Sequence, residues 1–288
     1  MPQTIYASMQ DDLQAVFDGA QENAVIVLPE GVFRQKLVIR TKGLTVTGAG
    51  AEKTTLVFGD YARKKDAGGK EYITFRSYTL AVCADGVTMK NLSVVNDAGH
   101  PEVLGQQIAL SVVADGFLME SCTLSSTQDT LFTGPLPPDL TERYRGFLDD
   151  GLCRSGQLRQ HFRNCLIEGT VDFIFGCGCS LFENCELRSL PDARNTGYIA
   201  APAHTLYQKE GYRFVNCAVT CAEGVEDGSI YLARPWRDHG LCIFEGCSYG
   251  SHIAPEGFDP WGSSGRNRTA RFREAPAIPG RANWINQR

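Results

Sequence analysis

A short motif recurs along this chain and constrains its fold more than any other feature. Each copy has an apolar residue, a polar residue, then Asn, Ser or Gly, then usually Cys, and continues as a short run of strand-forming residues. The copies begin at Met89, Met119, Phe162, Phe182, Phe214 and Phe244, between 20 and 43 residues apart. Units this small cannot bury their own apolar face, so they must stack on one another, which predicts a solenoid.

The segments outside the motif predict short strands. Apolar, β-branched residues concentrate at residues 25–28, 37–39, 44–47 and 87–89, and turn signals such as Asp85-Gly86 separate these runs. A solenoid whose units are strands without intervening helices is a parallel β-helix. We therefore expect an all-β protein with a single domain over residues 1–288, and the irregular gaps between copies as loop insertions on one face.

Three segments depart from the repeat. Residues 8–19 predict an amphipathic helix, with Ser8 as N-cap and Leu13, Val16 and Phe17 on one face, which would cover the open end of the core. Residues 134–156 form a Pro-rich, charged insertion that we expect to flank a cleft. Residues 254–288 have little periodicity and predict an irregular tail on the outside of the domain.

The composition excludes several classes of protein. With 43% hydrophobic and 21% charged residues the chain has ordinary globular composition, which excludes disorder and coiled coil. The net charge is −5, and the arginines within residues 266–273 are the one basic cluster, so we expect no nucleic-acid partner. No run of 18 apolar residues is present, so we expect no membrane insertion. We expect a monomer.

Eleven cysteines, an odd number, are scattered through the chain, and the N-terminus has no signal-peptide pattern. This favours free thiols in a reducing compartment, and hence a cytoplasmic protein, with the motif cysteines stacked inward between coils. A chain from which a leader had been removed would instead be secreted. The pairs Cys177/Cys179 and Cys217/Cys221 raise the alternative of a zinc site, but no CxxC pair exists and the histidines are dispersed. We expect no metal and no other cofactor.

Polar residues within otherwise apolar strings are the candidates for chemistry. Asp172 lies between Val171 and Phe173, where an unpaired carboxylate is costly to bury, and Asp129 lies in Gln128-Asp129-Thr130-Leu131. The structural alternatives are a solvent-facing position on a strand for Asp172 and a turn cap for Asp129. Arg234-Pro235-Trp236 offers a carboxylate fork beside a flat apolar surface, which a sugar acid would require, although Trp236 could equally pack between coils.

Four strings resemble the motifs of the pectin methylesterase (pectinesterase) family and occur in the same order as in that family. They are Gln106-Gln-Ile-Ala-Leu110, Gln128-Asp-Thr-Leu131, Gly169-Thr-Val-Asp-Phe-Ile-Phe-Gly176 and Leu232-Ala-Arg-Pro-Trp236. The chain as a whole resembles the bacterial branch of the family. The resemblance extends from about Thr4 to beyond Trp261. It implies a right-handed parallel β-helix and an enzyme that removes methyl groups from methyl-esterified galacturonan, as pectin or as oligogalacturonides, and releases methanol.

The resemblance also implies a division of roles. Asp172 would be the nucleophile, Asp129 the general acid and base, and Gln106 and Gln128 the oxyanion hole. Arg234 would orient Asp172 and keep it ionised, because a neighbouring guanidinium lowers the pKa of a carboxyl group. Asp129 must begin protonated to release methanol, and a nearby Asp172 carboxylate together with partial burial would favour this.

Substrate contacts are implied for Trp236 and Thr74, and also for Arg234 and Gln106. Adjacent Gln128 and Asp129 would point to opposite faces of a regular strand, so both can reach one cleft only if the backbone is irregular there. Two other functions remain open at this point. One is a pectate lyase or polygalacturonase on the same fold, and the other is a carbohydrate-binding β-helix without catalytic activity.

Overall fold

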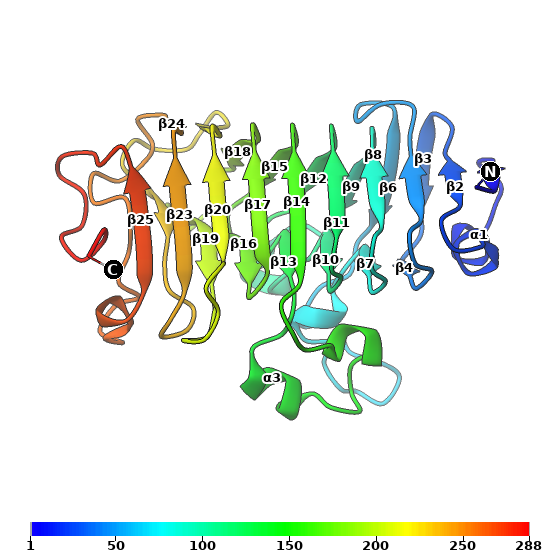
Figure 1. Cartoon of the computed structure of the whole chain (residues 1–288), viewed down its shortest axis with the longest axis horizontal. Helices are drawn as coiled ribbons and strands as arrows, with labels where there is room; N and C mark the ends of the chain where they lie inside the picture. The colour runs from blue at the N-terminus through cyan, green and yellow to red at the C-terminus, as the bar shows by residue number, and fades with distance from the viewer. Residues whose placement is uncertain (1, 288) are drawn as a thin grey trace.

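The computed structural model describes residues 2–287, which form an elongated stack of coils with the two ends of the chain at opposite ends of the stack (Figure 1). Each complete coil contributes one strand to each of three sheets, and all strand pairs within these sheets are parallel. The fold is a right-handed parallel β-helix, as the repeat and the resemblance predicted.

Neighbouring strands within each sheet come from successive coils. The first sheet comprises, in spatial order, β1 (Thr4–Tyr6), β2 (Val25–Val27), β5 (Thr45–Thr47), β8 (Thr88–Lys90), β11 (Phe117–Glu120), β14 (Arg159–Arg163), β17 (Cys179–Glu183), β20 (Tyr212–Val215), β23 (Leu241–Glu245) and β25 (Arg271–Ala275). The second comprises β24 (Ser248–Tyr249), β21 (Ala218–Cys221), β18 (Glu186–Ser189), β15 (Leu166–Gly169), β12 (Thr123–Ser125), β9 (Ser93–Asn96), β6 (Thr54–Phe58) and β3 (Gly31–Arg34). The third comprises β22 (Ile230–Ala233), β19 (Gly197–Pro202), β16 (Val171–Gly176), β13 (Leu131–Thr133), β10 (Leu110–Val112), β7 (Leu80–Val82) and β4 (Leu37–Ile39).

The recurrent motif marks the same position in successive coils. Phe162, Phe182, Phe214 and Phe244 are paired in register along the first sheet and are fully buried. Their rings stack, with successive centroids 4.9, 4.6 and 4.5 Å apart. The repeat therefore encodes a continuous aromatic column inside the solenoid.

The Asn and Cys of the motif form the turn that leads from the first sheet to the second. Asn164, Asn184 and Asn216 have φ between 52° and 53°, a left-handed conformation that Asn adopts more readily than most residues. The thiols that follow point inward, and Cys185 and Cys217 donate to the carbonyl oxygens of Phe162 and Phe182 in the preceding coil, each at 3.4 Å. The predicted stack of free thiols is confirmed.

The N-terminal helix covers the open end of the core, but it begins later than predicted. Helix α1 spans Leu13–Gly19 and its N-cap is Asp12, so the predicted Ser8 cap is wrong. Ser8 instead lies in a preceding turn, where its backbone N–H donates to the Asp11 carboxylate at 2.8 Å. Leu13 and Phe17 are fully buried.

The C-terminal tail is less irregular than its sequence indicated. It contains β25, which continues the first sheet by pairing with β23, and the short helix η3 (Arg266–Arg268). The pattern was obscure because Glu274 occupies an inward position of β25. Its carboxylate is buried and accepts two hydrogen bonds from Arg281, at 3.0 and 3.2 Å.

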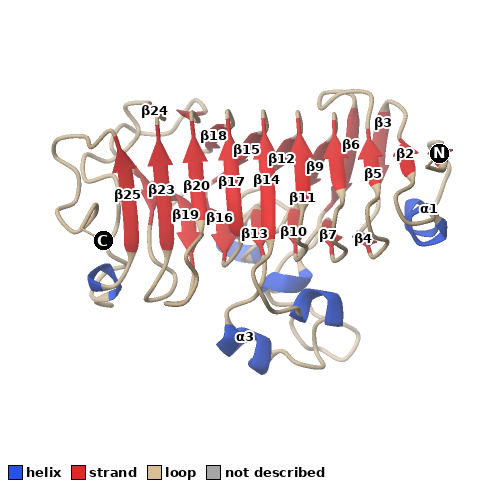
Figure 2. Ribbon diagram, in the orientation of Figure 1, coloured by secondary structure: helices blue, strands red, loops and turns tan. Residues whose placement is uncertain are grey.

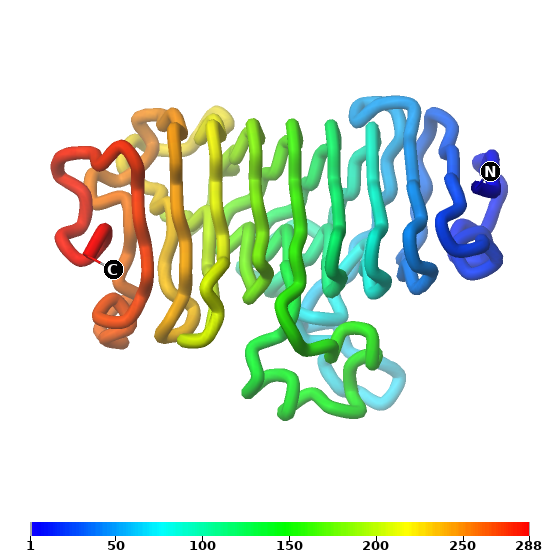
Figure 3. The backbone as a smooth tube through the Cα atoms, in the orientation of Figure 1, coloured from blue at the N-terminus to red at the C-terminus, as the bar shows by residue number. Residues whose placement is uncertain are grey.

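The remaining helices are short and include α2 (Pro101–Leu104), η1 (Thr74–Arg76), η2 (Asp150–Cys153) and α3 (Pro138–Arg143) (Figure 2). Helices α3 and η2 belong to the insertion 134–156, which projects from one side of the stack beside the segment 59–77 (Figure 3). The Nζ atom of Lys70 lies 3.6 Å from the centroid of the Phe147 ring, which joins these two segments. None of the helices within residues 2–287 is long and apolar enough to cross a lipid bilayer.

Candidate active site

Asp172 is placed by an irregularity in β16, an inner strand of the third sheet. Its φ is 52°, and the pairing of β16 with β19 shifts between Val171 and Ile174. The consecutive residues Phe173 and Ile174 consequently both face the interior core, which breaks the alternation of a regular strand. A bulge of this kind redirects a side chain, and here it turns Asp172 toward the outer face of the sheet. The alternative of an ordinary solvent-facing strand residue is wrong, because Asp172 is buried.

Asp129 lies on the neighbouring coil, also in a left-handed conformation. Its φ is 67°, which confirms the prediction of irregular backbone at Gln128-Asp129, and β13 begins two residues later. The backbone N–H of Asp129 donates to the carbonyl oxygen of Val171 at 3.0 Å, so the two aspartates lie on adjacent coils. Similarly, the backbone N–H of Gln107 donates to the carbonyl oxygen of Gln128 at 3.0 Å, which brings Gln106 beside Gln128.

The structure brings every site residue predicted from the sequence into one cleft of about 420 Å³. These residues are Thr74, Gln106, Gln128, Asp129, Asp172, Arg234 and Trp236. The insertion contributes one wall of the cleft through Leu140, Arg143 and Tyr144. The remaining lining residues are Phe75, Phe175, Ala201, Arg237 and Trp261.

Arg234 and Asp172 form a bidentate ion pair at the centre of this cleft. Nε and Nη2 of Arg234 donate to the two carboxylate oxygens of Asp172 at 2.8 and 2.7 Å. The guanidinium carbon lies 3.7 Å from the ring centroid of Tyr198 and 4.1 Å from that of Trp261, so the group is held between two aromatic faces. The pair therefore fixes the Asp172 carboxylate in one orientation.

Tyr198 and Trp261 were not predicted as site residues from the sequence. Tyr198 is the second residue of β19, the strand that pairs with β16. Tyr198 reaches the site because it pairs with Val171 in register, and that register is not readable from one sequence. Arg143 and Arg237 were also not predicted as site residues. Arg143 lies in a charged insertion and Arg237 follows Trp236, and in the sequence neither differs from an ordinary solvent-exposed arginine. Arg237 donates to the carboxylate of Asp139 in the insertion at 2.9 Å.

The two aspartates differ in pKa for a physical reason. Burial, followed by the charge of Asp172, raises the pKa of Asp129 well above its ordinary value of 3.8. Burial also raises the pKa of Asp172, while the hydrogen bonds and charge of Arg234 oppose that rise. Arg234 acts on the pKa of Asp172 in the expected direction, but desolvation is the larger effect and the net shift is upward. Arg234 still makes Asp172 the more acidic of the two carboxyl groups.

This arrangement places two carboxyl groups with different pKa values in one cleft, Asp172 paired with Arg234 and Asp129 with the more strongly raised pKa. Two carboxyl groups whose environments separate their pKa values are suited to different roles, one as an ionised nucleophile or base and the other as a proton donor. Neutral amide groups of Gln106 and Gln128 border the same space and are suitable donors to a developing oxyanion.

A pH-dependent stability effect follows from the raised pKa of Asp129. The folded protein holds this proton more tightly than the unfolded chain, so stability is lost as pH rises from about 4 through the folded pKa. Asp129→Asn keeps a neutral group of the same shape and removes that loss. We expect this variant to have a higher midpoint of thermal unfolding than the wild type at pH 8, with the difference shrinking toward pH 4. Differential scanning calorimetry over this range checks it, and a difference that grows toward low pH would contradict it.

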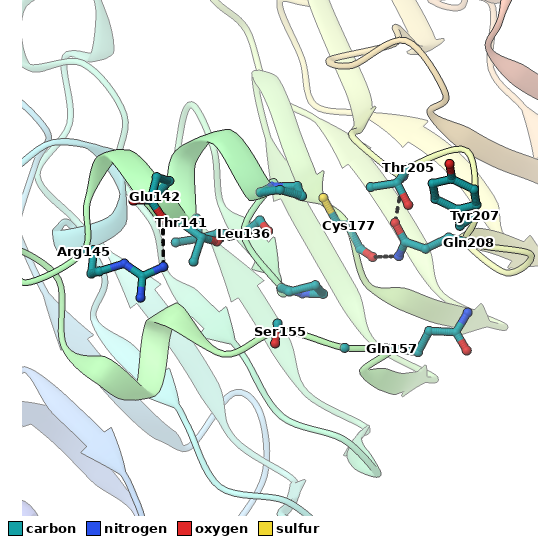
Figure 4. Close-up of a pocket in the computed structure, with 13 residues that line it drawn as sticks. Leu136, Thr141, Glu142, Arg145, Ser155, Gln157, Cys177, Thr205, Tyr207 and Gln208 are labelled. Atoms are coloured by element: carbon teal, nitrogen blue, oxygen red, sulfur yellow. Dashed lines mark hydrogen bonds and ion pairs between the residues drawn. The ribbon is translucent and has the colours of Figure 1, made fainter.

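A second cavity of about 490 Å³ lies on the other side of α3 (Figure 4). Thr141 and Glu142 line it from α3, and Tyr207 lies on the opposite side. Its lining is mainly apolar, and its charged residues Glu142 and Arg145 pair with each other at 2.8 Å. The paired carboxyl groups that hydrolytic chemistry requires lie instead in the smaller cleft.

No group of three or more His, Cys, Asp or Glu side chains within residues 2–287 is arranged to hold a metal ion. The zinc alternative raised by the cysteine spacing is thus not supported. Burial raises the pKa of the Cys177 thiol, and Cys221 is exposed at the end of β21.

Comparison with known proteins decides the family. The sequence profile of the pectinesterase family matches residues 3–135 and 144–286. The chain belongs to the pectinesterase family. Pectinesterase 31 of Arabidopsis thaliana is 29% identical, with 93% of this chain and 78% of the relative covered.

Solved structures agree with this pectinesterase assignment at the level of the fold. Pectin methylesterase from carrot has a TM-score of 0.79 at 24% identity, with 99% of this chain and 86% of the carrot chain covered. A pectin methylesterase in complex with a hexasaccharide has a TM-score of 0.77 at 23% identity, with 98% and 92% covered. The chain is accordingly a carboxylic ester hydrolase of the pectinesterase class.

Proposed function

We propose that this pectinesterase removes methyl groups from methyl-esterified galacturonan by a two-aspartate covalent mechanism. The observation that carries the proposal is the Arg234-paired carboxyl group of Asp172 next to the buried carboxyl group of Asp129, whose pKa is raised well above its ordinary value. An attacking carboxylate must be charged and a proton donor must be neutral, and the stronger rise in the pKa of Asp129 than of Asp172 suits the two groups to these roles.

In the first half-reaction an Asp172 oxygen attacks the carbonyl carbon of the methyl ester. The negative charge that develops on the carbonyl oxygen is stabilised by the amide N–H groups of Gln106 and Gln128. As the intermediate collapses, the bond to the methoxy oxygen breaks and Asp129 transfers its proton to that oxygen. Methanol leaves, and an anhydride joins Asp172 to the galacturonyl group.

In the second half-reaction the Asp129 carboxylate removes a proton from water, which attacks the galacturonyl carbonyl of the anhydride. The bond to Asp172 breaks and the galacturonic acid group is released. Asp129 carries the proton that it took from water and is ready for another cycle. Neutral glutamine donors suit both steps, because they stabilise an oxyanion without adding a fixed positive charge that would retain the anionic product.

The lining of the cleft supports a sugar-acid chain as substrate. Trp236 and Tyr144 offer flat apolar faces for sugar rings, and Arg143 offers positive charge for carboxylates. The related pectin methylesterase with a bound hexasaccharide is consistent with an oligosaccharide-length site. We propose methylated galacturonan, as polymer or as oligogalacturonides, with Trp236 and Thr74 among the contacts.

The test is methanol release from highly methylated pectin and from short methylated oligogalacturonides, with reducing ends and unsaturated products measured in parallel. We expect methanol without a change in chain length. Chain cleavage without methanol would instead support a lyase or glycosidase, and binding without either product would support the non-catalytic β-helix.

We also propose that the protein works in a reducing compartment such as the cytoplasm. All eleven cysteines are free thiols, and most of them are buried. Thiol titration of the unfolded protein purified from its own cells, under conditions that block exchange, tests this. Eleven reactive thiols are expected, and a lower number would contradict the proposal.

A further inference from the structure

One residue outside the proposed machinery contacts it directly. Arg194 lies on the loop between β18 and β19, and its Nη1 donates a hydrogen bond to Oε1 of Gln128 at 3.1 Å. Neither the motifs nor the proposed steps assign this arginine a role. Its side chain is 40% exposed, so packing alone does not account for its position.

The Arg194 guanidinium is itself held in place. Nε and Nη2 both donate to the Asp192 carboxylate at 2.6 Å, and the backbone N–H of Arg194 donates to the same carboxylate at 2.9 Å. The Asp192 side chain is only 5% exposed. Burial alone would raise the pKa of Asp192, but the hydrogen bonds from Arg194 lower it overall, so the carboxylate stays charged.

The contact has a chemical consequence for the Gln128 amide. A guanidinium has donors and no acceptor, so only the amide oxygen of Gln128 can face it. The amide nitrogen must then point away from Arg194, and Gln128 lines the same cleft as Asp129 and Asp172. A guanidinium remains charged at every working pH, so this orientation does not change with pH.

We propose that Arg194 is a positioning residue for the reaction, which acts by fixing the Gln128 amide with its nitrogen toward the oxyanion and by polarising that amide. A positive charge at the amide oxygen strengthens the N–H groups as donors, and it does so without placing a cation in the oxyanion position. This inference rests on the proposed role of Gln128.

The first test is steady-state kinetics of methanol release by Arg194→Ala. Loss of a complete oxyanion donor typically costs about 100- to 1000-fold in kcat, and loss of its orientation should cost part of that, about 10- to 100-fold. KM should change by less than about threefold, because the developing charge exists only in the transition state. Arg194→Lys retains a charged donor and should recover part of the loss. An unchanged kcat in Arg194→Ala would overturn the inference.

A double-mutant cycle with Gln128→Ala separates positioning from a general structural effect. If Arg194 acts through Gln128, the Arg194→Ala substitution should have almost no further effect on kcat in the Gln128→Ala background. Losses that multiply would show that Arg194 acts independently of Gln128 and would refute the inference. Circular dichroism and the thermal midpoint of each variant confirm that it is folded.

Arg213 provides a matched control. It also pairs with a carboxylate, that of Glu245 at 2.8 Å, but it lies on the first sheet with its side chain 57% exposed. Arg213→Ala should leave kcat unchanged. Wild-type protein that releases no methanol would refute the proposed function itself, whereas active wild type with full activity in Arg194→Ala would refute only this inference.

Discussion

Asp172→Asn is expected to abolish methanol release, with kcat reduced by at least about 10⁴-fold, because removal of a nucleophile from a covalent mechanism costs several orders of magnitude. Asparagine has almost the same shape as aspartate, and its Oδ1 can still accept a hydrogen bond from Arg234. It carries no negative charge and cannot form the anhydride. The measurement is the single-turnover and steady-state rate of methanol release from methylated oligogalacturonides.

The chain offers a close control for this substitution. Asp115 accepts a bidentate pair of hydrogen bonds from Arg159, at 2.9 and 2.6 Å, in the same manner as Asp172 accepts them from Arg234. This pair is absent from the lining of the cleft. Asp115→Asn should therefore retain wild-type kcat. The two-aspartate mechanism fails if Asp172→Asn keeps a tenth or more of the wild-type rate.

The fold was predictable from the sequence because each coil repeats the same inward positions. Equivalent positions of successive parallel strands are occupied by Phe162, Phe182, Phe214 and Phe244, so the spacing of the repeat in the sequence follows the stacking of the coils. Where an inward position carries a charged residue, the repeat can no longer be recognised in the sequence. Glu274 is buried by its pairing with Arg281, a partner seven residues away, and the strand that contains it was therefore not predicted.

The sequence predicted a set of residues that line the cleft, but not the backbone conformations and coil register that bring them together. Motifs placed Asp129, Asp172 and Arg234 together, and the adjacency of Gln128 and Asp129 required an irregular backbone. The left-handed conformation of Asp172 had no comparable signal, because its sequence neighbours read as a regular strand. Tyr198, Trp261 and Arg194 reach the site only through the register of the coils, which depends on loop lengths and long-range packing.

The net pKa shift of Asp172 was not predictable from the sequence for the same reason. A neighbouring arginine is visible in the family motif, and its effect on a carboxyl pKa has a known sign. The extent of burial is not visible, and at this site it outweighs the arginine. Because the net shift depends on a balance of two opposing effects, removal of one of them should have a large and directional result.

Arg234→Ala removes the hydrogen bonds and the charge that oppose the rise in the pKa of Asp172. The pKa of Asp172 should rise further, and because the nucleophile must be charged, the acidic limb of the kcat/KM profile should move to higher pH. The side chains of this pair are only 20% and 12% exposed, and loss of one partner from such a pair typically destabilises a protein by about 3–5 kcal/mol. That loss should be largest at high pH, where Asp172 is charged, and smallest at low pH, where it is protonated.

Arg234→Lys distinguishes charge from geometry. Lysine retains a positive charge but cannot make the bidentate contact or lie flat between Tyr198 and Trp261. We expect the acidic limb to return most of the way to its wild-type position, while kcat stays about 100-fold reduced because the nucleophile is misplaced. The measurements are pH–rate profiles of methanol release and urea unfolding at several pH values. If Arg234→Ala keeps the wild-type acidic limb, then Arg234 does not set the ionisation of Asp172, and the charge that makes Asp172 a nucleophile must be stabilised by other groups of the cleft.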